Sequence, residues 1–400
     1  MRQRKNGSSI KHPNLSDAEA KPQKKSPYSS KDVFLTCLGF RMLNALLIQT
    51  YFNPDEHWQA LEVAHRIAFG YGHLTWEWEE GIRSYLHPIM FALFYKLLAL
   101  LRLDTPCVMI KAPRLLQSIF SAVGDLYLYK LSFALFGDGV AKWAECGAWN
   151  YVFFGSSNGF TVMVFTFLPF CVAGIIKSKY WKLSGLILWV LGLYSVLGHK
   201  EFRFVLPVLP ISLIFAGYSL AALEERGSRN GEKKRSSCIC NKWRSRKQLA
   251  IFFLLASNIP MALYMSLIHQ RGTEDAMNYL SKEAAKGKVK SIVFLMPCHA
   301  TPYYSTLHNN LPMRFLDCAP SKGMPAESDR FMMDPVSFAV DFAKNWSRPS
   351  HIVLFDSEER HLKDFLVSHS FREVRRFFHA HFKVDRDLQA SVVVYAMTDT

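Results

Sequence analysis

Two adjacent carboxylates, Asp55 and Glu56, followed by His57, are the residues of this chain best suited to chemistry. They come directly after an apolar run, 33–50, that is long enough to cross a membrane. A carboxylate at such a boundary can take a proton from a hydroxyl group or orient a polar ligand. Acidic residues are also common in the first turn of a helix, where the helix dipole favours them, so the spacing leaves both interpretations open.

A second polar cluster lies between two later apolar runs. Its charged residues are His199, Lys200, Glu201 and Arg203. Lysine and arginine bind phosphate through charge-assisted hydrogen bonds, and a neighbouring histidine can bind a phosphate or sugar oxygen. The alternative is a charged turn whose long side chains reach from the membrane into water. His87, at the start of another apolar run, is either a further site residue or an ordinary interfacial histidine.

Seven apolar runs must position these residues. They span about 33–50, 86–103, 114–136, 160–176, 183–198, 203–223 and 249–268. Most approach the length that a helix needs to cross about 30 Å of hydrocarbon. Half of the 400 residues are hydrophobic, yet the net charge is +15. Because Lys and Arg gather in the N-terminal tail and in 224–248, between apolar runs, the pattern indicates a membrane protein rather than a nucleic-acid-binding protein.

The distribution of Lys and Arg predicts the orientation, since the cytosolic connections of membrane proteins are rich in these residues. With a cytosolic N-terminus, the cytosolic connections hold Arg102, Lys111, Arg114, Lys177, Lys179, Lys182 and the basic loop 224–248. The far, non-cytosolic side is then expected to hold 51–85, 137–159, 199–202 and 269–400. We expect 143–159 to be an irregular connection on that side. Arg41, inside the first run, and Arg203 need a partner or water.

The first two segments outside the runs differ in character. Residues 1–32 are polar and basic and are predicted to be a disordered cytosolic tail. The stretch 55–68 is predicted to be an amphipathic helix along the membrane surface, ended by the glycines after Phe69. Its apolar positions are Trp58, Leu61, Val63, Ala64, Ile67 and Ala68, and its polar positions are Glu56, Gln59, Glu62 and Arg66.

Residues 269–400 have a soluble character and are predicted to form a small α/β domain. Buried strands are expected at 291–295, 351–355 and 391–395, with helices at 274–285 and 358–368. Asn345 begins an Asn-Trp-Ser sequon and is a glycosylation candidate on the far side. Cys298 and Cys318 can pair in an oxidising compartment, whereas the scattered cysteines indicate no metal site.

Carboxylates and a phosphate-binding cluster on one side of a membrane suggest a lipid phosphate as substrate. Transfer of a sugar to an acceptor hydroxyl needs a base for the incoming proton and cations that stabilise the leaving phosphate. The sequence contains no nucleotide-binding loop of the GxxxxGKS type, so nucleotide-driven chemistry is unsupported.

The motifs together resemble the dolichyl-phosphate-mannose-dependent mannosyltransferases of the endoplasmic reticulum. They are Asn53–Gln59, Phe69–Gly72 with Leu74–Trp78, Arg83-Ser84 with His87-Pro88, His199–Phe204 and Met296–Ser305. The resemblance covers about 33–143 and 160–400. It is strongest to the members that add the third, α-1,2-linked mannose to the glycosylphosphatidylinositol (GPI) precursor. Family members carry several more crossings between positions 143 and 160, so this chain is expected to lack a central block of helices.

The resemblance implies a mainly α, polytopic membrane protein of the GT-C type, with about seven crossings in 33–268 and the α/β domain 269–400 in the lumen. The catalytic residues would be Asp55, as the base, and its neighbour Glu56. The residues that would bind donor phosphate or substrate are His199, Lys200, Arg203, His57 and His87.

Dolichyl-phosphate-mannose and a GPI precursor glycolipid are the partners that the resemblance implies, in the membrane of the endoplasmic reticulum. No cofactor, metal or nucleic acid is expected. The alternatives are an inactive, truncated relative that acts as a membrane scaffold or subunit, and an α-mannosyltransferase of N-glycan precursor assembly.

Overall fold

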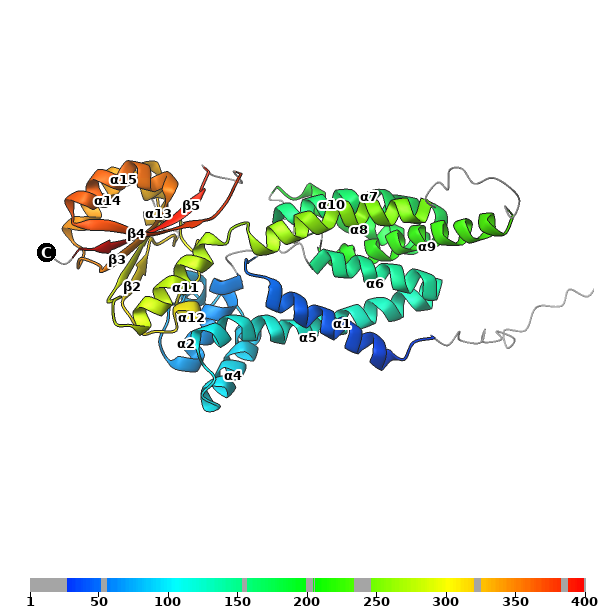
Figure 1. The fold of residues 1–400 in the computed structure, drawn as a ribbon, viewed down its shortest axis with the longest axis horizontal. Coiled ribbons are helices and arrows are strands. Elements are labelled where there is room, and N and C mark those ends of the chain that lie inside the picture. The colour runs from blue at the N-terminus through cyan, green and yellow to red at the C-terminus, as the bar shows by residue number, and fades with distance from the viewer. Residues whose placement is uncertain are drawn as a thin grey trace, which may run out of the picture.

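The computed structural model describes residues 27–51, 56–152, 157–198, 204, 206–233, 246–319, 325–382 and 388–398. A bundle of long helices and an α/β part with a five-stranded sheet follow one another along its long axis (Figure 1). The short helices within residues 51–85, called the first loop below, pack beside the α/β part (Figure 1). The mainly helical architecture with a small sheet is as predicted.

The bundle consists of apolar helices that approach one another closely. Its helices are α1 (Ser30–Leu47), α5 (Pro106–Phe136), α6 (Asp138–Val152), α7 (Ser157–Ser178), α8 (Trp181–Val196), α9 (Leu209–Lys233) and α10 (Arg246–Leu267). A β-carbon at Gly174 would collide with the backbone of Phe215, so α7 and α9 touch through a glycine, as membrane helices often do.

Three helical stretches of the described chain are long and apolar enough to cross a membrane. They are Pro106–Phe136, Leu206–Leu223 and Gln248–Ala285. Leu86–Leu100, Thr166–Ser178 and Trp181–Val196 are shorter apolar helices.

The stretch 86–103, which was expected to be the second crossing, forms helix α4 (Leu86–Leu100). The Arg114 side chain donates a hydrogen bond of 2.6 Å to the carbonyl of Ile48, so the start of α5 lies against the end of α1. A single crossing between these two points would place them at opposite faces of a membrane, and this contact argues against it. The apolar sequence of α4 instead has a buried face on α2 and α5, formed by Phe91, Tyr95 and Leu98, and an exposed face that includes Leu86, Leu93 and Leu100.

The expectation of an irregular connection at 143–159 is also wrong over much of its length. Helix α6 occupies Asp138–Val152, and α7 begins at Ser157. A β-carbon at Gly217 of α9 would lie 2.8 Å from the backbone nitrogen of Ala144, which shows how closely α6 and α9 pack. Helix α6 packs on its neighbour through small residues and has no long apolar run. A search for long apolar runs therefore does not detect it.

The α/β part contains a mixed sheet with the strand order β2-β1-β3-β5-β4. The strands are β1 (Ile292–Leu295), β2 (Met313–Phe315), β3 (His351–Phe355), β4 (Phe371–Phe378) and β5 (Ser391–Met397). β1 pairs in parallel with β2 and β3, whereas β5 is antiparallel to β3 and β4.

Side chains of the central strands alternate between two cores. Ile292 and Phe294 face α11 (Gly272–Ala285) and Trp58 of the first loop. Val293 and Leu295 face the opposite core, covered by α13 (Glu327–Met333), α14 (Pro335–Lys344) and α15 (Asp356–Ser368). Burial on both faces explains the continuous apolar sequence of these strands. The predicted strands at 291–295, 351–355 and 391–395 and helices at 274–285 and 358–368 are confirmed.

The helix predicted over 55–68 is present from Glu56 onward and has two parts. His57–Leu61 form a π-helical turn, η1, and Glu62–Phe69 form α2. α2 ends at Gly70, whose φ of 81° lies in the left-handed region that favours glycine. Glu62 was assigned to the polar edge of a surface helix, and this is wrong because it is fully buried against the α/β part.

Candidate active site

The first loop places Glu56 at the N-terminal end of η1, just after the end of α1. Glu56 is exposed and lines a cavity of about 190 Å³ between α1 and α5. Arg41, Asn44 and Arg114 line the same cavity. A carboxylate that is exposed in such a cavity can accept a proton from a bound hydroxyl group.

Behind this cavity, His57 and Arg114 meet the buried carboxylate of Glu274 on α11. His57 Nε2 lies 3.2 Å and Arg114 Nη2 lies 3.4 Å from the same Glu274 oxygen. The Tyr51 ring packs edge-on against His57, with ring centroids 5.4 Å apart. His57 is therefore held between the first loop and the α/β part, immediately beside the predicted catalytic pair. Its part in substrate binding stays a prediction.

Arg41, which needed a partner inside an apolar run, has one in Asp125 of α5. Its Nε and Nη2 atoms donate to the two carboxylate oxygens at 2.6 and 2.5 Å. Both side chains are buried. This bidentate ion pair fixes Arg41 at the wall of the cavity that Glu56 lines. It is specific in geometry because two N–H groups of the planar guanidinium reach the two oxygens of the carboxylate.

The loop 296–305, whose sequence contributed to the family resemblance, packs directly on the first loop. Trp58 Nε1 donates to the carbonyl of Thr301 at 2.8 Å, and the Tyr51 hydroxyl donates to that of Ala300 at 3.0 Å. The Trp58 ring also packs against His299, at a centroid distance of 4.6 Å. The two motifs, 243 residues apart in sequence, are therefore neighbours in the fold.

Glu62 provides the central anchor of this contact. Its carboxylate accepts hydrogen bonds from the backbone N–H groups of Tyr303 and Ser305 at 3.0 and 3.1 Å. The Ser305 hydroxyl donates a further hydrogen bond of 2.6 Å. Burial raises the pKa of Glu62, and the three donors partly oppose that shift because they favour the carboxylate.

A histidine pair continues the contact at the other end of α2. His65 Nδ1 lies 3.3 Å from the Tyr71 carbonyl, which can only accept, so this nitrogen carries the proton. His65 Nε2 then accepts from His308 Nδ1 at 3.1 Å. Burial lowers the pKa of His65 to about 4, so His65 is neutral at neutral pH. His308 Nε2 lies 3.7 Å from Asp104, which joins this pair to the start of α5.

The other predicted site residues are distributed as follows. Asp55, His199, Lys200 and Arg203 lie outside the described residues. His87 is exposed in the first turn of α4, where its ring packs edge-on against Phe91 at 5.0 Å. His87 is not among the residues that line the Glu56 cavity. The structure thus brings Glu56 and His57 together and places His87 on the adjoining helix α4.

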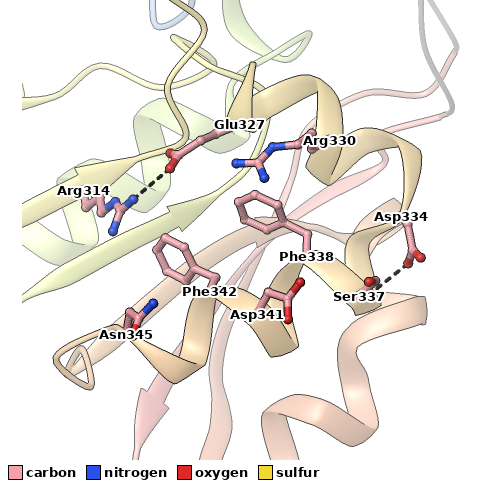
Figure 2. Close-up of a pocket in the computed structure, with 9 residues that line it drawn as sticks. All are labelled: Arg314, Glu327, Arg330, Asp334, Ser337, Phe338, Asp341, Phe342 and Asn345. Carbon is pink, nitrogen blue, oxygen red and sulfur yellow. Dashed lines mark hydrogen bonds and ion pairs between the residues drawn. The ribbon is translucent and has the colours of Figure 1, made fainter. Parts of the chain in front are cut away.

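A second cavity, of about 370 Å³, lies in the α/β part beside the sequon (Figure 2). The rings of Phe338 and Phe342 form one wall, and Arg314 lies over the Phe342 ring at 4.4 Å from its centroid. Exposed Asn345 stands at the end of α14 and lines the same cavity. Its side chain is accessible to modifying enzymes, and its glycosylation stays a prediction.

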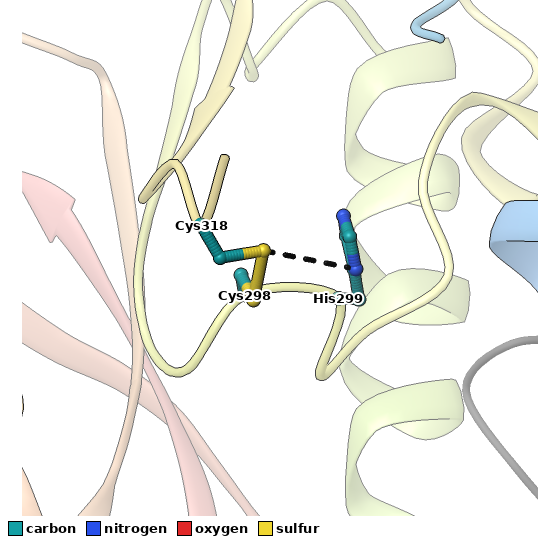
Figure 3. A group of neighbouring side chains, drawn as sticks. All are labelled: Cys298, His299 and Cys318. Carbon is teal, nitrogen blue, oxygen red and sulfur yellow. Dashed lines mark hydrogen bonds between the residues drawn. A yellow bond between two sulfur atoms is a disulfide. The ribbon is translucent and has the colours of Figure 1, made fainter. Parts of the chain in front are cut away.

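Cys298 and Cys318 form the disulfide that the sequence allowed. His299 Nδ1 lies 4.0 Å from the Cys318 sulfur (Figure 3). Three such residues resemble a metal-ligand set, but thiolates rather than disulfide sulfurs bind metals. In this form the group closes the loop that carries Thr301, Tyr303 and Ser305.

Several residues of the site were missed by sequence reasoning. They are Glu62, Arg114, Asp125 and Glu274. Asp125 carried a usable signal, since a lone acid and a lone arginine in separate apolar runs each require a partner. Glu62 and Glu274 sit in ordinary amphipathic helices, where an acid usually faces water, and Arg114 stands at the start of an apolar run and was assigned to the connection before it.

This geometry leads to a comparison with known proteins. The model of the Alg9-like mannosyltransferase family matches residues 32–148 and 147–308, which include the first loop, η1 and the loop that packs on it. The chain belongs to the Alg9-like mannosyltransferase family. It is therefore a glycosyltransferase by family. No solved structure matches the chain.

Named relatives agree with this family. Mannosyltransferase APTG1 of Arabidopsis thaliana is 50% identical over 92% of this chain and 92% of its own length. GPI alpha-1,2-mannosyltransferase 3 of Mus musculus is 32% identical over 87% and 86% of the two chains. The Homo sapiens protein of the same name is 31% identical over 91% and 86%.

The match to the Alg9-like family is divided at one place. Its two pieces meet at residues 147 and 148, within α6, where a central block was expected to be missing. The alignment to the Arabidopsis relative runs over 507 positions although this chain has 400 residues. Relatives therefore contain positions that have no counterpart in this chain.

Proposed function

We propose that this chain transfers mannose from dolichyl-phosphate-mannose to a GPI-anchor precursor and adds the third, α-1,2-linked mannose. The observation that carries the proposal is the set of relatives named as GPI mannosyltransferases, which align over most of the chain. The cavity that holds Glu56 with Arg41 and Arg114 supports it, because it combines a proton acceptor with cations.

In the proposed reaction, a hydroxyl oxygen of the acceptor glycan attacks the anomeric carbon of the donor mannose. The bond from that carbon to the phosphate oxygen breaks with inversion, and dolichyl phosphate leaves. The hydroxyl proton passes to the carboxylate of Asp55, with Glu56 beside it. His199, Lys200 and Arg203 are proposed to hold the leaving phosphate, and the scheme calls for no metal ion.

The proposed location is the lumenal face of the endoplasmic reticulum membrane, with a cytosolic N-terminus. If α6 replaces α4 among the crossings, their number stays at seven, and residues 51–105 and 268–400 share the lumenal side. The contact between Arg114 and Ile48 supports this arrangement. It moves Arg102, Lys111 and Arg114 to the lumenal side, against the usual bias toward cytosolic basic residues.

Complementation of cells that lack the third GPI mannose tests this function. The intact chain is expected to restore GPI-anchored proteins at the cell surface, and Asp55→Ala is expected to abolish rescue at equal protein level. Glu56→Gln separates the two carboxylates. Full rescue by Asp55→Ala would exclude Asp55 as the base.

The second candidate is an inactive relative that serves as a membrane scaffold or subunit. The division of the family match at 147–148 favours it, because the missing positions would normally add helices around the substrates. A chimera that carries the central segment of the Arabidopsis relative at this junction is the test. Rescue by the chimera but not by the native chain would support the scaffold.

A further inference from the structure

A further cavity, larger than the one that Glu56 lines, adjoins it. It measures about 470 Å³ and lies between the end of α1, the first turns of α5 and one face of α11. Ile48 and Arg114 line both cavities. The two cavities therefore share part of their walls.

The larger cavity carries an excess of positive charge. Its cations are Lys111, Arg114, Arg271 and Lys282, and its acids are Glu274 and Asp275. Arg271 pairs with Asp275 at 2.8 Å, and Arg114 lies 3.4 Å from Glu274, so these charges are largely balanced. Lys111 and Lys282 are exposed and form no ion pair with any described residue. Lys111 belongs to α5 and Lys282 to α11, and both line the cavity, so their ammonium groups are available to an anion.

Apolar side chains make up the rest of the lining. Leu46 comes from α1, Ile48 follows the end of α1, and Pro106 and Ile110 come from α5. Leu43 and Leu47, in the same turns of α1 as Leu46, are exposed and continue the apolar surface outward from the cavity. An anionic head with an apolar tail matches this arrangement, whereas a fully soluble anion would leave the apolar side unused.

We propose that this cavity binds the phosphodiester headgroup of a lipid substrate, with Lys111 and Lys282 as its charge partners. The proposal rests on the proposed function, in which the donor and the acceptor are both phosphodiester lipids. The lysines are point-charge phosphate ligands, and Arg114 would connect the bound headgroup to the Glu56 cavity. The shared chemistry is the lipid phosphodiester, and the experiment separates the two sources.

Cys107 offers a direct probe, because it is an exposed free cysteine that lines this cavity. The full chain in detergent is alkylated with a small maleimide, and the rate at Cys107 is followed by peptide-resolved mass spectrometry. The probes are a short-chain inositol phospholipid, a short-chain prenyl phosphate mannose and the matching diacylglycerol without phosphate. We expect one phosphate-bearing lipid to slow alkylation and the diacylglycerol to have no such effect.

The charge variant Lys111→Glu/Lys282→Glu is expected to weaken this protection by about tenfold or more in lipid concentration, since each charge-assisted contact is strong. Lys290→Glu/Lys363→Glu, at exposed positions of the α/β part, is the matched control and should retain protection. If the Glu variant elutes as an aggregate in size exclusion, Lys111→Gln/Lys282→Gln replaces it.

The results assign the ligand or reject the site. Protection by the inositol lipid places the acceptor here, and protection by the prenyl phosphate places the donor here. Equal protection by diacylglycerol, no protection by either phosphodiester, or full protection of the charge-reversed chain would overturn the proposal. Lysine-dependent protection in a chain that fails to rescue cells would uphold this site while the proposed transferase function fails.

Discussion

The Glu62 carboxylate accepts three hydrogen bonds from Tyr303 and Ser305 while fully buried, and so connects the predicted catalytic loop to the α/β part. Glu62→Ala would leave two buried N–H donors without partners, at about 1–3 kcal/mol each. We expect a loss of about 3 kcal/mol in unfolding free energy, measured by thermal unfolding in detergent. Glu62→Gln keeps an acceptor oxygen and should lose less.

Exposed Glu80, in the same loop, provides the matched control for Glu62. Glu80→Ala should change unfolding by no more than about 0.5 kcal/mol, since surface substitutions rarely do more. An equal effect of the two alanine variants would show that Glu62 does not anchor the loop.

The His65–His308 pair predicts that acid weakens the same contact. The pKa of folded His65 is about 4, below the ordinary value of 6.5, so between these values the unfolded chain binds a proton that the folded chain does not. Stability should therefore fall as the pH is lowered from 6.5 toward 4, by about 2 kcal/mol at pH 5. Thermal unfolding at pH 7.5 and pH 5 measures this, and His65→Gln should reduce the difference. An unchanged difference would assign the acid sensitivity to other groups.

At the scale of elements, α1 and α5 are joined by the buried Arg41–Asp125 pair. Arg41→Met would leave a buried carboxylate without its partner, which typically destabilises by about 3–5 kcal/mol. The double variant Arg41→Met/Asp125→Leu removes both charges and should be more stable than either single variant. Thermal unfolding of all four chains gives the coupling energy. Additive losses would show that the two charges do not interact.

The Cys298–Cys318 disulfide closes the loop that packs on η1 and α2. Cys298→Ser/Cys318→Ser should lose about 3 kcal/mol, the value typical of a loop of this length. The purified full chain is digested briefly with trypsin, and cleavage after Arg314 reports the opening of this loop. Cys107→Ser, which removes a free thiol, is the control. A digestion pattern that does not change would mean that the hydrogen bonds to Trp58 and Glu62 suffice.

The elements that could be predicted from sequence are those buried on both sides. β1, β3 and β5 are central strands with continuous apolar sequence, and α11 and α15 have clear helical periodicity. β4 was missed because it is an edge strand whose outward side chains are charged, as in Arg372, Glu373 and Arg376. The sequence alone does not show whether α4 crosses the membrane, because an apolar helix that packs on protein has the same composition as one that crosses lipid.

Only those site residues that belong to a recognisable sequence motif could be predicted. Glu56 and His57 follow from the acidic motif after the first apolar run, but the surroundings do not. Glu62 and Glu274 act through residues far away in sequence, and without the fold an acid on an amphipathic helix is most simply assigned to the surface. The disulfide was predictable because both cysteines belong to the same soluble segment.

At the scale of the whole molecule, the arrangement of α1, α4 and α5 makes a prediction opposite to that of the basic-residue pattern. Cys107, in the first turn of α5, should lie on the same side of the membrane as the α/β part. In sealed microsomes, a membrane-impermeant maleimide should label Cys107 only after permeabilisation. Glycosylation at Asn345, read by endoglycosidase, marks the lumenal side in the same sample. Labelling of Cys107 in intact microsomes would restore α4 as a crossing.

The contact between the first loop and the loop 296–305 also determines the order in which the molecule can be completed. Trp58 and Glu62 receive their partners from residues 243 and 241 positions later. At a synthesis rate of about 5–20 residues per second, roughly ten to fifty seconds separate the two segments. During that interval, each nascent chain exposes Trp58 and an unpaired Glu62, which makes the first loop a natural client of chaperones and of quality control. A chain that ends prematurely before Tyr303 would carry the predicted catalytic carboxylates but never leave that state.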